Sequence, residues 1–156
     1  MTEKATFAAG CFWHVESTFS KVKGVVNTKV GYTGGKMKKP SYKHVCSGNT
    51  GHAESIDIEF DPKVVSYNEL LEVFWKIHDP TTLNRQGADV GTQYRSAIFY
   101  HNDKQKKQAE NSLKNVQKSL KNKIVTQIKK SPEFYKAEEY HQKYMEKNII
   151  QRLFRI

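Results

Sequence analysis

The sequence has little cysteine and no long apolar run. It holds two cysteines in 156 residues, which excludes a small secreted fold held together by disulfides. No apolar stretch approaches the roughly 20 residues that a membrane-spanning helix needs. Residues 1–4 lead directly into a short strand-like segment, without the long apolar region of a secretory signal. We therefore expect a cytoplasmic protein with no membrane partner.

The length and the apolar content suit one folded domain. A chain of 156 residues with 37% hydrophobic and 12% aromatic residues can bury a core. The same composition argues against disorder. We expect a single domain over residues 1–156.

The positive charge is concentrated in the last third of the chain. The net charge is +10. Residues 1–100 hold 12 basic and 10 acidic side chains, whereas residues 101–156 hold 14 basic and 6 acidic ones. A nucleic-acid or acidic partner would explain this excess, and so would a solvated lysine-rich face. Because 12 of those 14 basic side chains are lysines spread along the segment, we favour the solvated face and expect no nucleic-acid partner.

Hydrophobic periodicity predicts alternating strands and helices. Strands are expected at residues 5–9, 25–32, 56–60, 96–100 and 124–128. Helices are expected from Cys11 to Gly24, from a capping box at Ser66 and Glu69, after a cap at Asp103, and from Pro132 through Met145. Residues 33–52 form a loop region with one short helix at 41–46. This order predicts helices packed on a mixed sheet.

Cys11 is the strongest candidate for a reactive side chain. The motif Gly10-Cys11-Phe12-Trp13 lies where a strand gives way to a helix, and a helix N-terminus favours the reactive thiolate. A buried, inert cysteine is the alternative. Metal binding by Cys11 with His14, Cys46 and His52 is disfavoured, because the spacings match no known zinc pattern.

Two further segments could contribute polar groups. Glu54 directly precedes an alternating strand, where partial burial beside a thiolate would raise its pKa and make it a general acid. A surface glutamate is the alternative. His52 could instead pair with Cys11 as in a thiol hydrolase. Residues 86–95 form a polar, Gly-rich turn that lacks the pattern of a phosphate site.

Several motifs occur together in one order along the chain. They are Gly10-Cys11-Phe12-Trp13, residues 31–35, residues 45–54, residues 78–80 and residues 89–96. With these motifs the sequence closely resembles the A-type peptide methionine sulfoxide reductases over nearly its whole length, from about Phe7 to Asn148. The resemblance implies an α+β fold with a ferredoxin-like two-layer sandwich, a mixed sheet and flanking helices.

The resemblance also implies a role for each matching residue. Cys11 matches the nucleophile that attacks the sulfoxide sulfur and becomes a sulfenic acid. Glu54 matches the acid that protonates the sulfoxide oxygen. Tyr42 and Tyr94 match the tyrosines that hold this oxygen, and Asp89 matches a carboxylate in the supporting network. Phe12 and Trp13 match the pocket for the S-methyl group.

The implied reaction is the thiol-dependent reduction of methionine S-sulfoxide, free or in proteins. The resemblance implies no bound cofactor and no metal, but an external reductant such as a thioredoxin-like protein or a dithiol. Many family members carry resolving cysteines in a Gly-rich tail, whereas residues 148–156 contain neither Cys nor Gly. The sulfenic acid must then be resolved by Cys46 or by an external thiol, and we favour the external thiol.

Overall fold

The structure is a computed structural model that describes the backbone of residues 1–153 and the side chains of residues 1–148. Residues 154–156, which belong to the tail discussed above, lie outside the described residues. No helix within the described part of the chain is both long and apolar enough to cross a bilayer.

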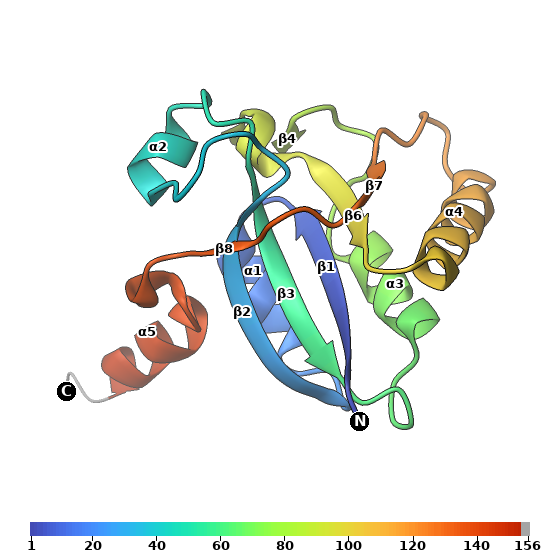
Figure 1. The fold of residues 1–156 in the computed structure, drawn as a ribbon, viewed down its shortest axis with the longest axis horizontal. Helices are drawn as coiled ribbons and strands as arrows, with labels where there is room; N and C mark the ends of the chain where they lie inside the picture. Colours follow the sequence, from blue (N-terminus) through green and yellow to red (C-terminus); the bar gives the residue numbers. More distant parts are fainter. Residues whose placement is uncertain (154–156) are drawn as a thin grey trace.

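A six-stranded sheet forms the centre of the molecule, in the order β7-β6-β1-β3-β2-β8 (Figure 1). Its strands are β1 (Glu3–Ala9), β2 (Val25–Thr33), β3 (Ala53–Phe60), β6 (Ser96–Tyr100), β7 (Gln127–Lys130) and β8 (Tyr135–Lys136). Neighbouring strands are antiparallel except β6 and β7, which are parallel. The prediction of an α+β fold with a mixed sheet and flanking helices is confirmed.

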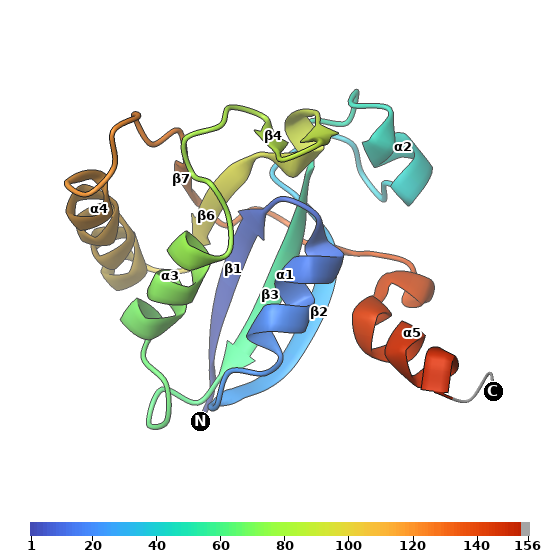
Figure 2. The ribbon, with the colours of Figure 1, turned by 180° about the vertical axis from the view of Figure 1, so that it is seen from behind.

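Helices cover one face of this sheet, as Figure 2 shows. They are α1 (Phe12–Phe19) and α3 (Tyr67–Lys76), and α4 (Asp103–Gln117) packs against α3. The helix α5 (Tyr144–Leu153) lies beside α1, and the short α2 (Tyr42–Cys46) lies beyond the end of the sheet. The connection after α3 contains the hairpin strands β4 (Arg85–Gln86) and β5 (Asp89–Val90) and the 3₁₀ helix η1 (Thr92–Tyr94).

The core lies between the sheet and these helices. Alternate residues of the central strands point toward the helices, so that Phe7 of β1 is paired in register with Ile56 of β3. Both are fully buried, and the ring of Phe7 lies 5.1 Å from that of Phe74 on α3 and 5.6 Å from that of Phe19 on α1. The strand alternation therefore fixes which face carries the helices.

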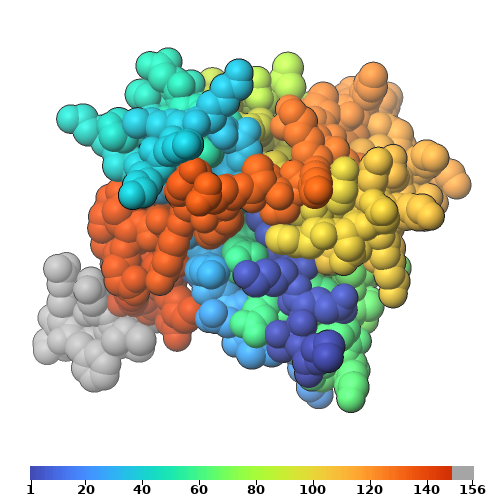
Figure 3. All heavy atoms as spheres, in the orientation of Figure 1, coloured from blue at the N-terminus to red at the C-terminus, as the bar shows by residue number. Residues whose placement is uncertain are grey.

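The chain between β7 and α5 crosses the opposite face of the sheet (Figure 3). It adds β8 to the edge strand β2, with Tyr32 paired to Tyr135. Gly31 lies under this crossing, where a Cβ atom would collide with the carbonyl oxygen of Tyr135. The 3₁₀ helix η2 (Glu139–His141) then leads to α5.

The capping box of Ser66 and Glu69 is confirmed at the start of α3, and the short helix predicted at 41–46 is α2. The cap of α4 is Asn102 rather than Asp103, because the Asn102 side chain accepts the hydrogen bond from the backbone N–H of Gln105 at 2.8 Å.

Two predictions near the C-terminal end are wrong. The strand predicted at 124–128 is β7, which begins at Gln127. The last helix begins at Tyr144 and not near Pro132. The segment after Pro132 forms β8 instead, since its backbone groups find partners on the edge of β2, where the N–H of Ala137 donates to Val30 at 2.9 Å.

Candidate active site

Cys11 lies at the junction of β1 and α1. It is the N-cap residue of the helix, and Gly10 makes the turn with a φ of 94°. This backbone conformation favours glycine, and a Cβ at Gly10 would lie 2.9 Å from the Cγ atom of Gln86. The turn therefore holds a free, half-buried thiol at the N-terminus of α1.

The Cys11 thiol has a raised pKa. Burial is the largest of the effects that together raise the pKa of Cys11 to about 11. The backbone N–H groups of Trp13 and His14 lower this pKa, whereas the carboxylates of Glu54 and Asp89 raise it. The helix N-terminus acts in the expected direction, but burial outweighs it and the net pKa of Cys11 is raised.

Glu54 brings a buried carboxyl group to the start of α1. Its side chain is 1% exposed, and its Oε1 accepts a hydrogen bond from the backbone N–H of Phe12 at 3.3 Å. Its Oε2 is buried and has no partner among the described residues. Burial raises the pKa of Glu54 to about 7, with a smaller upward contribution from Asp89 and a downward one from Phe12. Such a group carries a proton about half of the time near pH 7 and can serve as a general acid.

Two tyrosine hydroxyls share the surroundings of Glu54. Tyr42 is the first residue of α2 and Tyr94 the last of η1, and both are half-buried. Burial is the main reason why the pKa of each hydroxyl is raised, and the charge of Glu54 raises both further. Two protonated phenols beside a carboxyl group form a set of hydrogen-bond donors for an oxygen atom.

Asp89 lies at the rim of this group. It belongs to the β4–β5 hairpin and its side chain is exposed. Its negative charge raises the pKa of Cys11, of Glu54 and of Tyr94. Asp89 thus acts on all three groups through its charge.

The two aromatic residues after Cys11 differ in exposure. Phe12 is 1% exposed and packs on Tyr32 with ring centroids 5.8 Å apart. Trp13 is half-buried, and its ring stacks on that of Tyr144 at 3.9 Å with an angle of 12°. Trp13 therefore offers the more accessible apolar surface near the thiol.

The sequence analysis missed two residues that border the site. The Glu138 carboxylate accepts hydrogen bonds from the Tyr32 hydroxyl and from the backbone N–H of Tyr42, both at 2.9 Å. His141 accepts a hydrogen bond from the indole N–H of Trp13 at 2.9 Å. In the sequence, His141 lies among aromatic residues in the segment that is predicted to be the last helix, and nothing else there indicates a contact with the site.

The remaining sequence candidates are Cys46 and His52. Cys46 is a free, exposed thiol at the end of α2 and contributes to the raised pKa of both Tyr42 and Tyr94. His52 is buried, with Nδ1 accepting from the N–H of Gly35 at 3.0 Å and Nε2 bonded to the carbonyl of Met37 at 2.6 Å. Both ring nitrogens are thus occupied, which removes His52 as a base for Cys11. Within the described residues, no group of three or more His, Cys, Asp or Glu side chains could hold a metal ion.

Comparison with known proteins identifies the relatives of this chain. The model of the family described as peptide methionine sulfoxide reductase matches residues 3–155. A peptide methionine sulfoxide reductase MsrA from Methanothermobacter thermautotrophicus is 58% identical over 154 residues, covering 97% of this chain and 91% of the relative. The crystal structure of Mxr1 from Saccharomyces cerevisiae in reduced form has a TM-score of 0.91 and 43% identity, covering 95% of this chain and 86% of that one. A structure of Mxr1 in complex with Trx2 has a TM-score of 0.66 and 30% identity, covering 92% and 84%.

Proposed function

The chain belongs to the peptide methionine sulfoxide reductase family, and from this premise we propose that it reduces methionine S-sulfoxide, free or in proteins, to methionine. The main support for this proposal is the arrangement of Cys11 and Glu54. A free thiol at the start of α1 lies beside a buried carboxyl group whose pKa is about 7 and which bonds to the next backbone N–H. A nucleophile and a proton donor are the two groups that the reaction needs.

In the reductive step, the Cys11 sulfur attacks the sulfoxide sulfur while Glu54 gives a proton to the sulfoxide oxygen. The new bond joins the two sulfur atoms, and the S–O bond breaks as the oxygen leaves as water, with one proton from Glu54 and one from the Cys11 thiol. Water then attacks the Cys11 sulfur, the S–S bond breaks, methionine leaves and Glu54 regains its proton, so that one thiol and one sulfoxide give one sulfenic acid and one thioether. A neutral Glu54 also removes one of the two negative charges that raise the pKa of Cys11. Protonation of Glu54 thus makes the thiol easier to ionise.

We assign the hydroxyls of Tyr42 and Tyr94 to the sulfoxide oxygen, on which negative charge develops. Their raised pKa values keep them protonated and able to donate. Asp89 supports the acid by raising the pKa of Glu54. Phe12 and Trp13 form the apolar wall for the S-methyl group, with Trp13 in contact with substrate and Phe12 behind it. Separate places for the oxygen and the methyl group distinguish the two epimers at sulfur.

The sulfenic acid is recycled by an external thiol, as from a thioredoxin-like protein or a dithiol. The first thiol displaces water to form a mixed disulfide with Cys11, and a second thiol releases Cys11 and leaves as a disulfide. The structure of the relative Mxr1 in complex with Trx2 supports a partner of this kind. Cys46 is the alternative resolving thiol. Single-turnover assays on Cys46→Ser decide between them, because a normal first turnover followed by full loss of recycling would favour Cys46.

The fold type, the domain organisation and the location that we propose are those expected for this family. The order β6-β1-β3-β2, with α1 between β1 and β2 and α3 between β3 and β6, supports a ferredoxin-like two-layer arrangement. We propose one catalytic domain over residues 1–156, acting as a monomer. Dependence on reduced thiols supports a cytoplasmic location.

The experiment that tests the function is a reductase assay that resolves the two diastereomers. Methionine S-sulfoxide, methionine R-sulfoxide and a peptide that contains methionine sulfoxide are each supplied with dithiothreitol or thioredoxin. We expect reduction of the S epimer, free and in the peptide, and no reduction of the R epimer. Equal reduction of both epimers, or of neither, would overturn the proposal.

A further inference from the structure

Trp13 is held by a residue from the far end of the chain. Its indole N–H donates to Nδ1 of His141 at 2.9 Å, across 128 positions in the sequence. His141 is fully buried, with 0% exposure. The side chain assigned to the substrate's methyl group therefore depends on a contact that lies outside every motif near Cys11.

The direction of this hydrogen bond fixes the protonation of His141. An indole N–H can only donate, so Nδ1 of His141 must carry no proton and the neutral ring carries its proton on Nε2. Burial lowers the pKa of His141, against an opposing contribution from Glu138, which agrees with a neutral ring. The other titratable groups packed on the ring are the phenols of Tyr42 and Tyr140.

The His141 ring also contacts the other aromatic residues of the site. Its centroid lies 4.4 Å from that of Tyr42, 5.2 Å from that of Phe12 and 5.6 Å from that of Trp13. One imidazole thus touches both residues of the proposed methyl wall and one of the two proposed oxygen donors.

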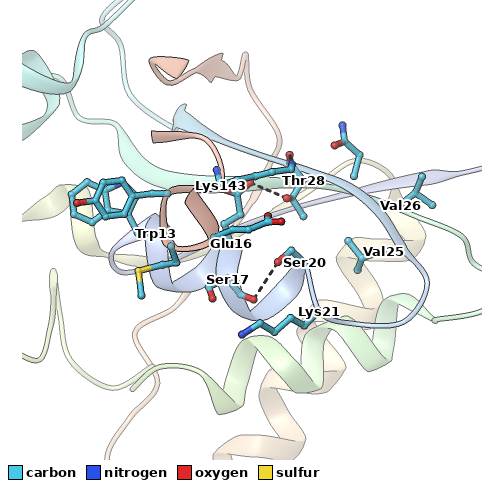
Figure 4. Close-up of a pocket in the computed structure, with 13 residues that line it drawn as sticks. Trp13, Glu16, Ser17, Ser20, Lys21, Val25, Val26, Thr28 and Lys143 are labelled. Atoms are coloured by element: carbon cyan, nitrogen blue, oxygen red, sulfur yellow. Dashed lines mark hydrogen bonds between the residues drawn. The ribbon is translucent and has the colours of Figure 1, made fainter. Parts of the chain in front are cut away.

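Trp13 has space into which it could turn without this contact. It borders a cavity of about 550 Å³ between α1, the start of β2 and the start of α5 (Figure 4). A half-buried indole beside such a space can take more than one orientation. The hydrogen bond to His141 and the stacking on Tyr144, with ring centroids 3.9 Å apart, together select one of them.

The segment that carries His141 is itself firmly attached. The buried Glu16 carboxylate accepts hydrogen bonds from the backbone N–H of Lys143 at 2.6 Å and from the Thr28 hydroxyl at 2.8 Å (Figure 4). The amide side chain of Gln142 bonds to both the N–H and the C=O of Val30 at 2.9 Å. The two residues that follow His141 therefore attach this segment to α1 and β2.

We propose that His141 is a positioning residue for the substrate, which holds the Trp13 indole in the orientation that receives the S-methyl group. The proposal rests on the proposed function, since it concerns how that site binds methionine sulfoxide. Stability alone does not account for an imidazole here, because its Nε2 is buried with no partner among the described residues. A buried donor without a partner costs free energy that an apolar side chain would not.

The test compares three variants of His141. His141→Leu removes the acceptor, His141→Asn keeps a polar acceptor near the position of Nδ1, and His141→Gln moves the amide toward the position of Nε2. We expect KM for methionine sulfoxide to rise about 3- to 10-fold in the Leu and Gln variants, the loss of one neutral hydrogen bond, with little change in kcat. The Asn variant should stay within about 2-fold of the parent protein.

A second measurement follows Trp13 directly. The protein has two tryptophans, and Trp75→Phe assigns their two indole N–H signals in a proton–nitrogen NMR spectrum. The Trp13 signal should shift and exchange faster with solvent in His141→Leu, and should be restored in His141→Asn. His101→Leu is the matched control, because His101 is an exposed histidine that follows β6 and bonds to Thr6, away from Trp13.

Several results would overturn the proposal. An unchanged KM together with an unchanged Trp13 signal in His141→Leu is one, and a KM for His141→Asn as high as that for His141→Leu is another. If His141→Leu does not fold, the Asn and Gln variants still differ in where they place the acceptor, and equal KM values for the two would count against it. The NMR signal needs no substrate, whereas failure of the parent protein to reduce methionine sulfoxide would overturn the proposed function itself.

Discussion

Replacing Glu54 with glutamine removes one proton from the site and leaves its shape nearly unchanged. The amide oxygen can still accept the hydrogen bond from the backbone N–H of Phe12, which Oε1 of Glu54 accepts at 3.3 Å. The amide cannot give a proton to the sulfoxide oxygen. We therefore expect slow formation of the Cys11 sulfenic acid with little change in substrate affinity.

The size of the effect follows from the pKa of Glu54. At pH 7, a pKa of about 7 leaves roughly half of the molecules with a protonated Glu54. The ordinary value of 4.5 would leave about 0.3%. Burial thus raises the population of the proton-carrying form by about 150-fold. General acid catalysis contributes about 10²- to 10⁴-fold, so we expect Glu54→Gln to slow the reductive step by at least about 100-fold.

The assay is a single turnover without reductant, from pH 5 to 9, in which the sulfenic acid is trapped and measured by mass spectrometry. The rate for the parent protein should rise up to about pH 7 and then level off, because Glu54 loses its proton there while the fraction of Cys11 thiolate keeps growing toward its pKa of about 11. The variant should lack this break and rise throughout the range. Glu59→Gln is the matched control, because Glu59 lies on the same strand and bonds to Thr2 on the opposite face of the sheet.

The same substitution should change the stability in a pH-dependent way. The folded-state pKa of Glu54 lies above its ordinary value, so the folded protein binds the proton more tightly and loses stability as the pH rises from about 4.5 to about 7. Glu54→Gln should remove this loss and be more stable than the parent protein at pH 8, by up to about 3 kcal/mol, with little difference at pH 4.

Two results would refute the reasoning about Glu54. The first is a single-turnover rate for Glu54→Gln at pH 6 that equals that of the parent protein. The second is a parent rate that rises from pH 6 to 9 without a break near pH 7, since the acid would then not be a group with a pKa near 7.

Three further predictions concern other parts of the site. Cys11→Ser should abolish sulfenic acid formation, and any residual trapping, seen by peptide mass spectrometry, would place the nucleophile elsewhere. Tyr42→Phe and Tyr94→Phe should each slow the single turnover by about 10-fold. The double variant should be slowed by more than the product of the two single factors, since each donor partly replaces the other. A slowing equal to that product would show that the donors act independently. Gln142→Leu should lower the free energy of unfolding by about 2 to 3 kcal/mol because both backbone groups of Val30 lose their partner, and a urea titration showing less than about 0.5 kcal/mol would contradict this.

Local chemistry made much of the fold predictable from the sequence. The alternation of Ile56, Ile58 and Phe60 with charged residues predicted β3, whose three apolar side chains are buried. The capping box of Ser66 and Glu69 predicted where α3 begins. Each of these signals lies within a few residues along the chain, so neither depended on the tertiary structure.

The features that escaped prediction depend on distant contacts. The segment after Pro132 has helix-like spacing, but it forms β8 because its backbone pairs with the edge of β2. That edge is more than 100 positions away along the sequence. The contacts of Glu138 with Tyr32 and of His141 with Trp13 have the same origin. The pKa of Cys11 has two causes of different range, since the helix N-terminus that lowers it is visible in the local sequence whereas the burial that raises it further is not.

The attachment of residues 138–142 to β2 and α1 also has a consequence for synthesis of the protein. Synthesis reaches His141 128 positions after Trp13, and Glu138 106 positions after Tyr32. A nascent chain therefore carries Trp13 and Tyr32 before the residues that bind their side chains have been made. Until residues 138–142 have been made, the Trp13 indole and the backbone of Val30 lack the partners that they have in the folded protein, so the aromatic wall beside Cys11 is completed only at a late stage of synthesis.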